Sequence, residues 1–417
     1  MLPTLLLLGL ACLAPPAQDP AQAASAPTEP LAYSPKVLAQ LEATCTTALD
    51  ELVERAGLPG ASLAIVLPGG QTLAIASGTT DPEGGRPLTP ADRMLSGSVG
   101  KSYVAAMALH LAARGKLDLD SELSAHLGEL PWFERLAGSK AITIRHLLRH
   151  QSGLERYVFA PEFWQVLTSE TDKVWEPSEL IAFVLDREPL FPPGEGWAYA
   201  DTNYILVGMV LEQVADATVY DYVHGHLLAP HGLADTVPSD SRRIPGLVQG
   251  HTTSFRTFGL PDRVLDEAGS FVINPQFEWC GGGFASTPLD LARWARIYYS
   301  GEAFDLPYLD QLLKTVDADP RLLGPGSAYG PGCIVRPSRL GQMRGHDGIM
   351  TGYEASTAWF PELEVAAALQ LNMDGNRELG KPLPLVLVDL VALAAGELGL
   401  ELPEQPSPEP GPAPADR

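Results

Sequence analysis

Cysteine is scarce in this chain, which has four cysteines among its 417 residues. Cys45, Cys280 and Cys333 lie far apart in the sequence, whereas zinc sites and redox motifs use closely spaced pairs of ligands or thiols. The spacing therefore predicts neither a zinc site nor a redox centre. A disulfide between Cys280 and Cys333 stays open for an exported protein, and the odd number would still leave one thiol free.

Positive charge and long apolar runs are also in short supply. Lys and Arg number 28 against 51 Asp and Glu, which gives a formal net charge of −23. So acidic a chain is a poor partner for nucleic acid or for an anionic membrane surface, and neither is expected. After the N-terminal segment, no apolar run reads as long enough to cross a bilayer. Because 45% of the residues are hydrophobic, the chain can bury a large globular core.

The two ends of the chain differ in composition from the part between them. A short apolar run opens the chain, and the small residues at 21–26 fit a signal-peptidase cleavage pattern, although no Lys or Arg precedes the run. We therefore expect residues 1–26 to be an export signal, residues 27–34 a linker, and the mature protein to be periplasmic or extracellular. Cys12 leaves a lipid anchor open as an alternative. Residues 401–417 are rich in Pro, Glu and Ala and are expected to be disordered.

Between these ends, hydrophobic periodicity predicts a sheet built from both halves of the chain. Apolar residues at helical spacing predict long helices at Pro35–Ala56 and Pro382–Leu398. Residues 117–290 read as mostly helical, with long loops and without strand alternation. Alternation and turn residues predict the following strands: 61–67, 71–77, 329–336, 342–345, 353–360 and 364–371.

The most informative local pattern is Ser98-Val99-Gly100-Lys101, which opens an apolar stretch expected to be a buried helix from Ser98 to Leu111. A serine hydroxyl is a weak nucleophile at neutral pH and needs a neighbour that takes its proton. Because residues three apart share one face of a helix, Lys101 is expected to place its amine beside the Ser98 hydroxyl. A lysine at the buried end of a helix is costly unless it is paired or neutralised, and this motif alone leaves a functional and a structural role open.

Two further segments follow this pattern along the chain. The first is Pro193–Tyr204 (PGEGWAYADTNY), and the second is Arg344–Tyr353 (RGHDGIMTGY). The chain therefore carries, in this order, an S-x-x-K, a Y-x-D and an H-x-G motif. This order resembles the penicillin-recognising serine hydrolases, namely class C β-lactamases, serine D-alanyl-D-alanine carboxypeptidases and their esterase relatives.

The resemblance extends beyond the three motifs. Residues 142–154 and 281–293 are similar to two other segments of that family, so the likeness covers roughly Pro35 to Leu400. It implies a β-lactamase/transpeptidase-like fold, an α/β plus all-α arrangement in which an antiparallel sheet flanked by helices receives an inserted helical lobe. The implied parts are a core at 35–100 and 325–400 and a helical lobe at about 101–324.

The resemblance also implies roles for single residues. Ser98 would be the nucleophile that forms an acyl-enzyme, Lys101 would activate it, and Tyr199 would pass the proton to the leaving group. The family analogy makes His346 a partner of Tyr199 and of the substrate carboxylate. It places the oxyanion hole at the backbone N–H groups of Ser98 and Ile349.

The second and third motifs carry one fitting feature and two departures from the family pattern. Gly348 fits, because the backbone beside the oxyanion hole must approach the ligand closely. Asp201 stands where the family usually has Asn, and its carboxylate would hold Lys101 protonated and shift proton transfer to Tyr199. Asp347 stands where a hydroxyl residue is common, and a negative charge there would disfavour a substrate carboxylate.

Two groups of histidines have spacings that metal sites can use. His146 and His150 are four residues apart on a predicted helix, but no Glu follows His146 and no third ligand is evident. His224, His226 and His231 form a looser group whose members do not share one helix face. A structural role is the better interpretation of both groups, so neither a metal nor another cofactor is expected.

One other hydrolase design comes close to the sequence. Ser96–Gly100 nearly matches the nucleophile elbow of α/β-hydrolases, but its first glycine is missing and residues 92–95 are a poor buried strand. An α/β-hydrolase is therefore not expected.

Together with the resemblance, the sequence predicts an exported serine hydrolase, most like a D-alanyl-D-alanine carboxypeptidase, that acts on a small peptide, β-lactam or ester. The alternatives are a carboxylesterase or β-lactamase on the same scaffold, or a non-catalytic muropeptide-binding module. Residues 155–175 and 252–279 are expected to line the pocket.

Overall fold

The computed structural model describes residues 32–375 and 377–403. The predicted export signal with Cys12, most of the predicted linker, and the tail from residue 404 lie outside the described residues. The described chain is organised around an eight-stranded antiparallel sheet in the order β2-β1-β11-β10-β9-β8-β7-β6. The strands are β1 (Gly60–Val66), β2 (Thr72–Gly78), β6 (Val316–Asp317), β7 (Ala328–Gly330), β8 (Cys333–Ser338), β9 (Gly341–Met350), β10 (Tyr353–Phe360) and β11 (Val365–Leu371).

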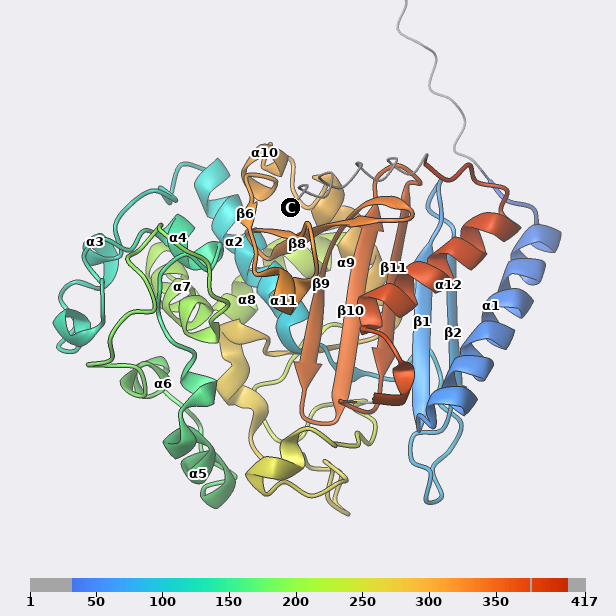
Figure 1. Cartoon of the computed structure of the whole chain (residues 1–417), viewed down its shortest axis with the longest axis horizontal. Coiled ribbons are helices and arrows are strands. Elements are labelled where there is room, and N and C mark those ends of the chain that lie inside the picture. The colour runs from blue at the N-terminus through green and yellow to red at the C-terminus, as the bar shows by residue number, and fades with distance from the viewer. Residues whose placement is uncertain (1–31, 376, 404–417) are drawn as a thin grey trace, which may run out of the picture. The chain divides into compact units, whose positions relative to one another are not determined.

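Helices cover both faces of this sheet. Helix α1 (Pro35–Ala56) and α12 (Leu383–Glu397) lie together across one face, and α9 (Pro288–Ser300) packs on the other (Figure 1). The central strands β1 and β11 are buried along their whole length, because both of their faces are covered. Leu63 and Ile65 of β1 belong to the core under α1 and α12, whereas Ala64 and Val66 belong to the larger core on the opposite face.

Most of the remaining helices form the lobe seen on the left of Figure 1. They are α2 (Lys101–Ala113), α3 (Ser124–Leu127), α4 (Ile144–Leu148), α5 (Pro161–Ser169), α6 (Pro177–Ala182), α7 (Asp201–Ala215) and α8 (Val219–Val223). Two short helices, α10 (Leu309–Leu312) and α11 (Pro320–Leu323), lie nearer the middle of the view, beside the edge strands of the sheet. Helix α2 is buried from Lys101 to Leu111, as its uniformly apolar sequence predicts. A small three-stranded sheet joins β3 (Met94–Leu95), β5 (Phe284–Ser286) and β4 (Val237–Pro238).

The fold class predicted from the sequence is confirmed, but several boundaries are wrong. The strand predicted at 329–336 is two strands, β7 and β8, because Gly332 turns the chain with φ 56°. Strand β9 runs on to Met350, past the predicted end at residue 345. Strands β4 and β5 lie inside the segment read as helical. Helix α9 packs on the sheet, so the core reaches further back than residue 325.

Residues 377–397 are long and apolar enough to cross a membrane by length and hydropathy alone, in contrast to the expectation from sequence. Half of that window is buried in the fold. Val386, Leu387, Leu390 and Val391 of α12 lie in the core that α1 and the sheet share. The hydropathy of this segment thus matches its position as a core helix.

Gly208 of α7 tests how tightly the lobe packs behind the segment 275–281. A β carbon at Gly208 would lie 2.3 Å from Cys280 Sγ and 2.8 Å from the Trp279 ring. We expect Gly208→Ala to lower the free energy of unfolding by about 1–3 kcal/mol through overpacking. Gly396→Ala in α12 is the matched control, because no atom lies within 4 Å of its added carbon; helix propensity should raise its stability by up to about 1 kcal/mol. Urea unfolding of both variants measures the difference, and equal effects would contradict the packing.

Candidate active site

Ser98 lies in a short 3₁₀ turn, Gly97–Gly100, directly before α2. The helix predicted to begin at Ser98 therefore begins three residues later, at Lys101. The predicted pairing still forms, because Lys101 Nζ donates a hydrogen bond of 3.0 Å to Ser98 Oγ. The nucleophile and its neighbour thus come from one continuous turn of the chain.

Lys101 is a fully buried ammonium group with three partners. Its side chain is 0% exposed, and Nζ donates to Asp201 Oδ1 at 2.7 Å and to the Gly281 carbonyl as well as to Ser98. Burial alone would lower the pKa of Lys101, but the charge of Asp201 and the nearby Tyr199 outweigh it, so the pKa is raised. Lys101 is therefore a cation at neutral pH and donates its hydrogen bonds.

Asp201, the first residue of α7, is held between two cations. Its Oδ1 accepts from Lys101, and its Oδ2 accepts from Arg156 Nε at 3.0 Å and Nη2 at 2.7 Å. Burial would raise the pKa of Asp201, but Arg156 and Lys101 together hold it well below its usual range. Sequence reasoning missed Arg156, because nothing in the local pattern shows which carboxylate it meets 45 residues later.

Tyr199 lies beside these charges. The distance from Lys101 Nζ to the centroid of its ring is 5.0 Å, and the distance from Arg156 Cζ is 5.2 Å. Burial raises the pKa of Tyr199, and Lys101 and Ser98, which lie close to its hydroxyl, oppose that rise. The resting phenol is therefore protonated, with two cations placed to stabilise it when it loses that proton.

His150 fixes the backbone on both sides of Tyr199. Its carbonyl accepts from the Ala198 N–H at 3.0 Å, and its Nδ1 accepts from the Ala200 N–H at 3.3 Å and from Asn203 Nδ2 at 3.1 Å. Its ring lies over the Tyr199 ring with centroids 4.2 Å apart. His150 itself has φ 59°, a conformation that is uncommon for a non-glycine residue. Because Nδ1 accepts twice, the ring proton is assigned to Nε2.

His346 on β9 meets Tyr329, and not the predicted partner Tyr199. Its Nε2 accepts from the Tyr329 hydroxyl at 2.8 Å, and its Nδ1 donates to the Asp347 carbonyl at 2.7 Å. The centroid of the Tyr199 ring is 6.3 Å away. Burial and the Lys101 charge lower the pKa of His346 to about 4, so the ring is neutral. The sequence did not link Tyr329 to the site, because it predicted one strand at 329–336 where the structure has β7, which carries Tyr329, and β8.

Close backbone contacts join β9 to the turn that carries Ser98. A β carbon on Gly348 would lie 1.9 Å from the Ser96 carbonyl oxygen and 3.0 Å from the Ser98 nitrogen. One on Gly97 would lie 2.8 Å from the Ile349 nitrogen. The backbone nitrogens of Ser98 and Ile349, predicted to form the oxyanion hole, thus lie where β9 meets the turn that carries Ser98. Positions 97 and 348 in this contact accept only glycine.

Glu278 is a second acid near this cluster that sequence reasoning did not identify. It lies in the 3₁₀ segment Pro275–Gly281, and a β carbon on Gly282 would be 2.5 Å from its Oε2. Burial raises the pKa of Glu278 to about 7, while Lys101 opposes the rise. The neighbouring Trp279 has φ 34°, a strained conformation of the kind that gathers at functional sites.

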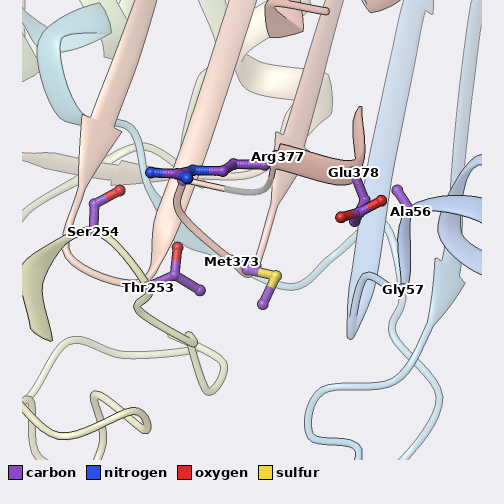
Figure 2. A pocket seen from close by; sticks show the side chains of 8 residues that line it. Ala56, Gly57, Thr253, Ser254, Met373, Arg377 and Glu378 are labelled. Atoms are coloured by element: carbon purple, nitrogen blue, oxygen red, sulfur yellow. The ribbon is translucent and has the colours of Figure 1, made fainter. Parts of the chain in front are cut away.

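Ser98, Arg156, Tyr199 and His346 open into a cleft of about 630 Å³. The rest of its wall comes from α11 and the loop after it, from β8, β9 and β10, and from the first residues of α12 with Pro382 before them. The sequence instead predicted the segments 155–175 and 252–279, of which Arg156 alone lines the cleft. A separate hollow of about 560 Å³ shares no lining residue with it (Figure 2). That hollow is lined by Ala56, Gly57, Thr253, Ser254, Met373, Gly375, Arg377 and Glu378.

The arginines along the cleft have carboxylate partners. Arg336 Nη2 pairs with Asp347 Oδ2, and Ser356 donates to the other oxygen of Asp347 at 2.7 Å. Arg321, at the exposed rim, pairs with Asp319 at 2.6 Å. Asp347, the residue next to His346, therefore neutralises the guanidinium of Arg336, which lines the same cleft.

The cysteines and the remaining histidines have no part in this cluster. Cys45, Cys280 and Cys333 are free and buried, so the Cys280–Cys333 disulfide left open by the sequence does not form. His146 Nδ1 accepts from the Thr143 N–H at the start of α4. His231 Nε2 donates to the Ala303 carbonyl. Within residues 32–375 and 377–403, no three side chains of the metal-binding types gather in a way that could hold a metal ion.

Comparison with known proteins extends the likeness over most of the chain. The family model described as Beta-lactamase matches residues 46–390. Esterase EstB of Burkholderia gladioli is 33% identical over 224 residues, which span 51% of this chain and 55% of that protein. Penicillin-binding protein 4* of Bacillus subtilis (strain 168) is 24% identical over 279 residues, which span 64% of this chain and 58% of that protein. The chain thus aligns with less than two thirds of the length of these relatives.

Solved structures with similar folds match over a larger share. A D-stereospecific amidohydrolase from Streptomyces sp. superposes with a TM-score of 0.68 at 26% identity, covering 81% of this chain and 97% of that one. A D-amino acid amidase from Ochrobactrum anthropi SV3 superposes with a TM-score of 0.70 at 22% identity, covering 86% and 99%. At that identity the second likeness shows the fold alone.

Asp201→Asn should move the acidic limb of the pH dependence of kcat/KM to lower pH. The carboxylate raises the pKa of both Tyr199 and Lys101, so its removal lowers both, and the pKa of Glu278 falls with them. The double variant Asp201→Asn/Arg156→Met removes one charge of each sign and should return the limb toward the wild-type position. The profile is measured with one ester up to about pH 11.5, because the pKa of Tyr199 is raised above its usual value of about 10. A limb that stays in place in the single variant would contradict the assigned electrostatics.

His150 should act through the position of Tyr199. Asn keeps an acceptor near the place of Nδ1 and tolerates positive φ, so His150→Asn should retain most of the wild-type kcat. His150→Ala loses that acceptor and should lower kcat by about 10- to 100-fold, since small misplacements of catalytic groups cost this much. Thermal unfolding of both variants separates lost positioning from lost folding. Equal losses of kcat in the Asn and Ala variants at equal stability would contradict the role of His150 in positioning Tyr199.

Proposed function

The chain belongs to the β-lactamase family of serine hydrolases, and on that premise we propose that it hydrolyses esters or amides that carry no carboxylate beside the scissile bond. The observation that carries the proposal is the cluster of Lys101, Tyr199 and Asp201 around Ser98. The names of two similar proteins, an esterase and a D-stereospecific amidohydrolase, agree with this substrate class, whereas the name of a third, a penicillin-binding protein, agrees with the second candidate below.

The cluster supplies one proton carrier for both halves of the reaction. The ionised form of Tyr199, stabilised by Lys101 and Arg156, takes the proton of Ser98 as Oγ bonds to the substrate carbonyl carbon. Tyr199 then gives this proton to the leaving oxygen or nitrogen as its bond to the carbonyl carbon breaks. In deacylation the phenolate takes a proton from water, the resulting hydroxide attacks the acyl carbon, and the proton returns to Ser98.

The charges of the cluster suit a negative charge that forms during the reaction. Two cations, Lys101 and Arg156, share the carboxylate of Asp201, and burial favours the neutral form of the other nearby acid, Glu278, by raising its pKa to about 7. The Tyr199 phenolate lies next to both cations and adds negative charge beside them when it forms. Preorganised charge of this kind stabilises an ionic state without reorganisation of solvent.

The same charges argue against a substrate carboxylate on the sheet side of the cleft. Arg336 lines the cleft together with the H-x-G motif, and Asp347 of that motif already pairs with it. A carboxylate that entered there would have to displace Asp347 or lie beside its negative charge. This favours a neutral ester or amide over the D-alanyl-D-alanine carboxypeptidase activity predicted from the sequence, which is the second candidate because Arg336 does face the cleft.

Mass spectrometry with p-nitrophenyl acetate and with a penicillin tests the proposal. We expect an acetyl adduct on Ser98 or steady ester turnover, both lost in Ser98→Ala, with ester kcat/KM at least about tenfold above that for the penicillin. Asp347→Ser frees Arg336 and should raise the rate of penicillin acylation. A penicillin adduct that forms faster than ester turnover would support the carboxypeptidase instead. No Ser98-dependent reaction with either compound would reject the hydrolase assignment.

A further inference from the structure

Large apolar side chains are exposed on one side of the cleft. Leu322 of α11 is 55% exposed, Leu385 of α12 is 48% exposed, and Ile349 of β9 is 44% exposed, and all three line the cleft that contains Ser98. Exposed apolar residues scattered singly need no explanation, but several that meet in one cleft mark a binding surface. Because they line the same cleft as Ser98, this surface is expected to contact part of the substrate.

The packing of Tyr199 shows which part of the substrate this is. Leu323 of α11 and Tyr199 pack against the same small apolar cluster, formed by Ala318, Tyr329 and Ile334. Tyr199 delivers the proton to the leaving group in the proposed reaction, so the leaving group lies on the Tyr199 side of the scissile bond. Helix α11 is therefore the wall beside the leaving group.

This wall offers hydrocarbon and no unpaired charge. Pro320, Leu322, Leu323 and Pro325 form it, and the charged neighbours Arg321 and Arg336 are paired with Asp319 and Asp347. A charged alcohol or amine would lose its water there without gaining a partner. An alkyl or aryl group would instead remove exposed leucine surface from water.

We propose that α11, together with Leu385 of α12, is a leaving-group subsite that selects esters and amides of apolar alcohols or amines. This inference rests on the proposed ester or amide hydrolysis and names its substrate class. The leaving alcohol departs with the proton from Tyr199 as the acyl group stays on Ser98. The subsite thus acts on acylation and leaves deacylation unchanged.

Acetate esters of linear primary alcohols, from ethyl to hexyl, test the subsite. All of them form the same acetyl-Ser98, so differences in kcat/KM between them report on the alcohol alone. We expect kcat/KM to rise by up to about fourfold for each methylene that is fully buried. Leu322→Ser should flatten this series. Leu190→Ser is the matched control, because Leu190 is 56% exposed and lies outside the cleft, and it should keep the wild-type slope.

The outcomes separate the subsite from the reaction itself. Ser98-dependent turnover with a flat alcohol series overturns the subsite and leaves the hydrolase standing. A parallel series of ethyl esters of longer acids, if it rises while the alcohol series stays flat, places the acyl group on α11 and also overturns the inference. Absence of any Ser98-dependent turnover rejects the proposed function instead. A slope that Leu322→Ser and Leu190→Ser reduce equally contradicts a local role of α11.

Discussion

The buried ammonium of Lys101 is the constraint on which the site depends. Taking an ammonium group out of water costs several kcal/mol unless its protons are bonded and its charge is matched. Asp201 at the start of α7, the Gly281 carbonyl and the Ser98 hydroxyl meet these needs from three separate segments. Their placement is therefore coupled, since a shift of any one of them leaves a buried charge without a partner. The geometry that stabilises Lys101 is the same geometry that positions the nucleophile.

Bringing these segments together requires backbone contacts that side chains would block. Gly97 and Gly348 let β9 run against the turn that carries Ser98, and a β carbon on Gly100 would lie 2.8 Å from the backbone of Gly282. The contact between Gly100 and Gly282 brings the Gly281 carbonyl to Lys101. The glycines thus serve close approach, and the buried salt bridge explains why the approach has to be so close.

Local pattern predicted several of the elements, whereas contacts between distant segments determine the site. The helix at Pro35–Ala56 and the strand at Tyr353–Phe360 have the bounds that the sequence predicts; the helix buries one face, and the strand is buried on both faces of the sheet. Arg156, Tyr329 and α11 could not be placed from the sequence. Each acquires its role from a partner far along the chain: Asp201 for Arg156, His346 for Tyr329, and the Tyr199 cluster for α11. Short motifs report the nucleophile, but they carry no information on what surrounds it.

The two departures from the family pattern follow one electrostatic rule. Asp201 stands in place of an amide and is matched by Arg156, and Asp347 stands in place of a hydroxyl residue and is matched by Arg336. Each of these two carboxylates thus has a guanidinium partner. A guanidinium that is already paired is a weaker site for a substrate carboxylate. With its cations engaged and its outer wall made of leucine and proline, the cleft can gain binding energy mainly by burying hydrocarbon. The charges of Lys101 and Arg156 thus stabilise the Tyr199 phenolate that forms during the reaction, whereas the apolar wall of the cleft discriminates between substrates.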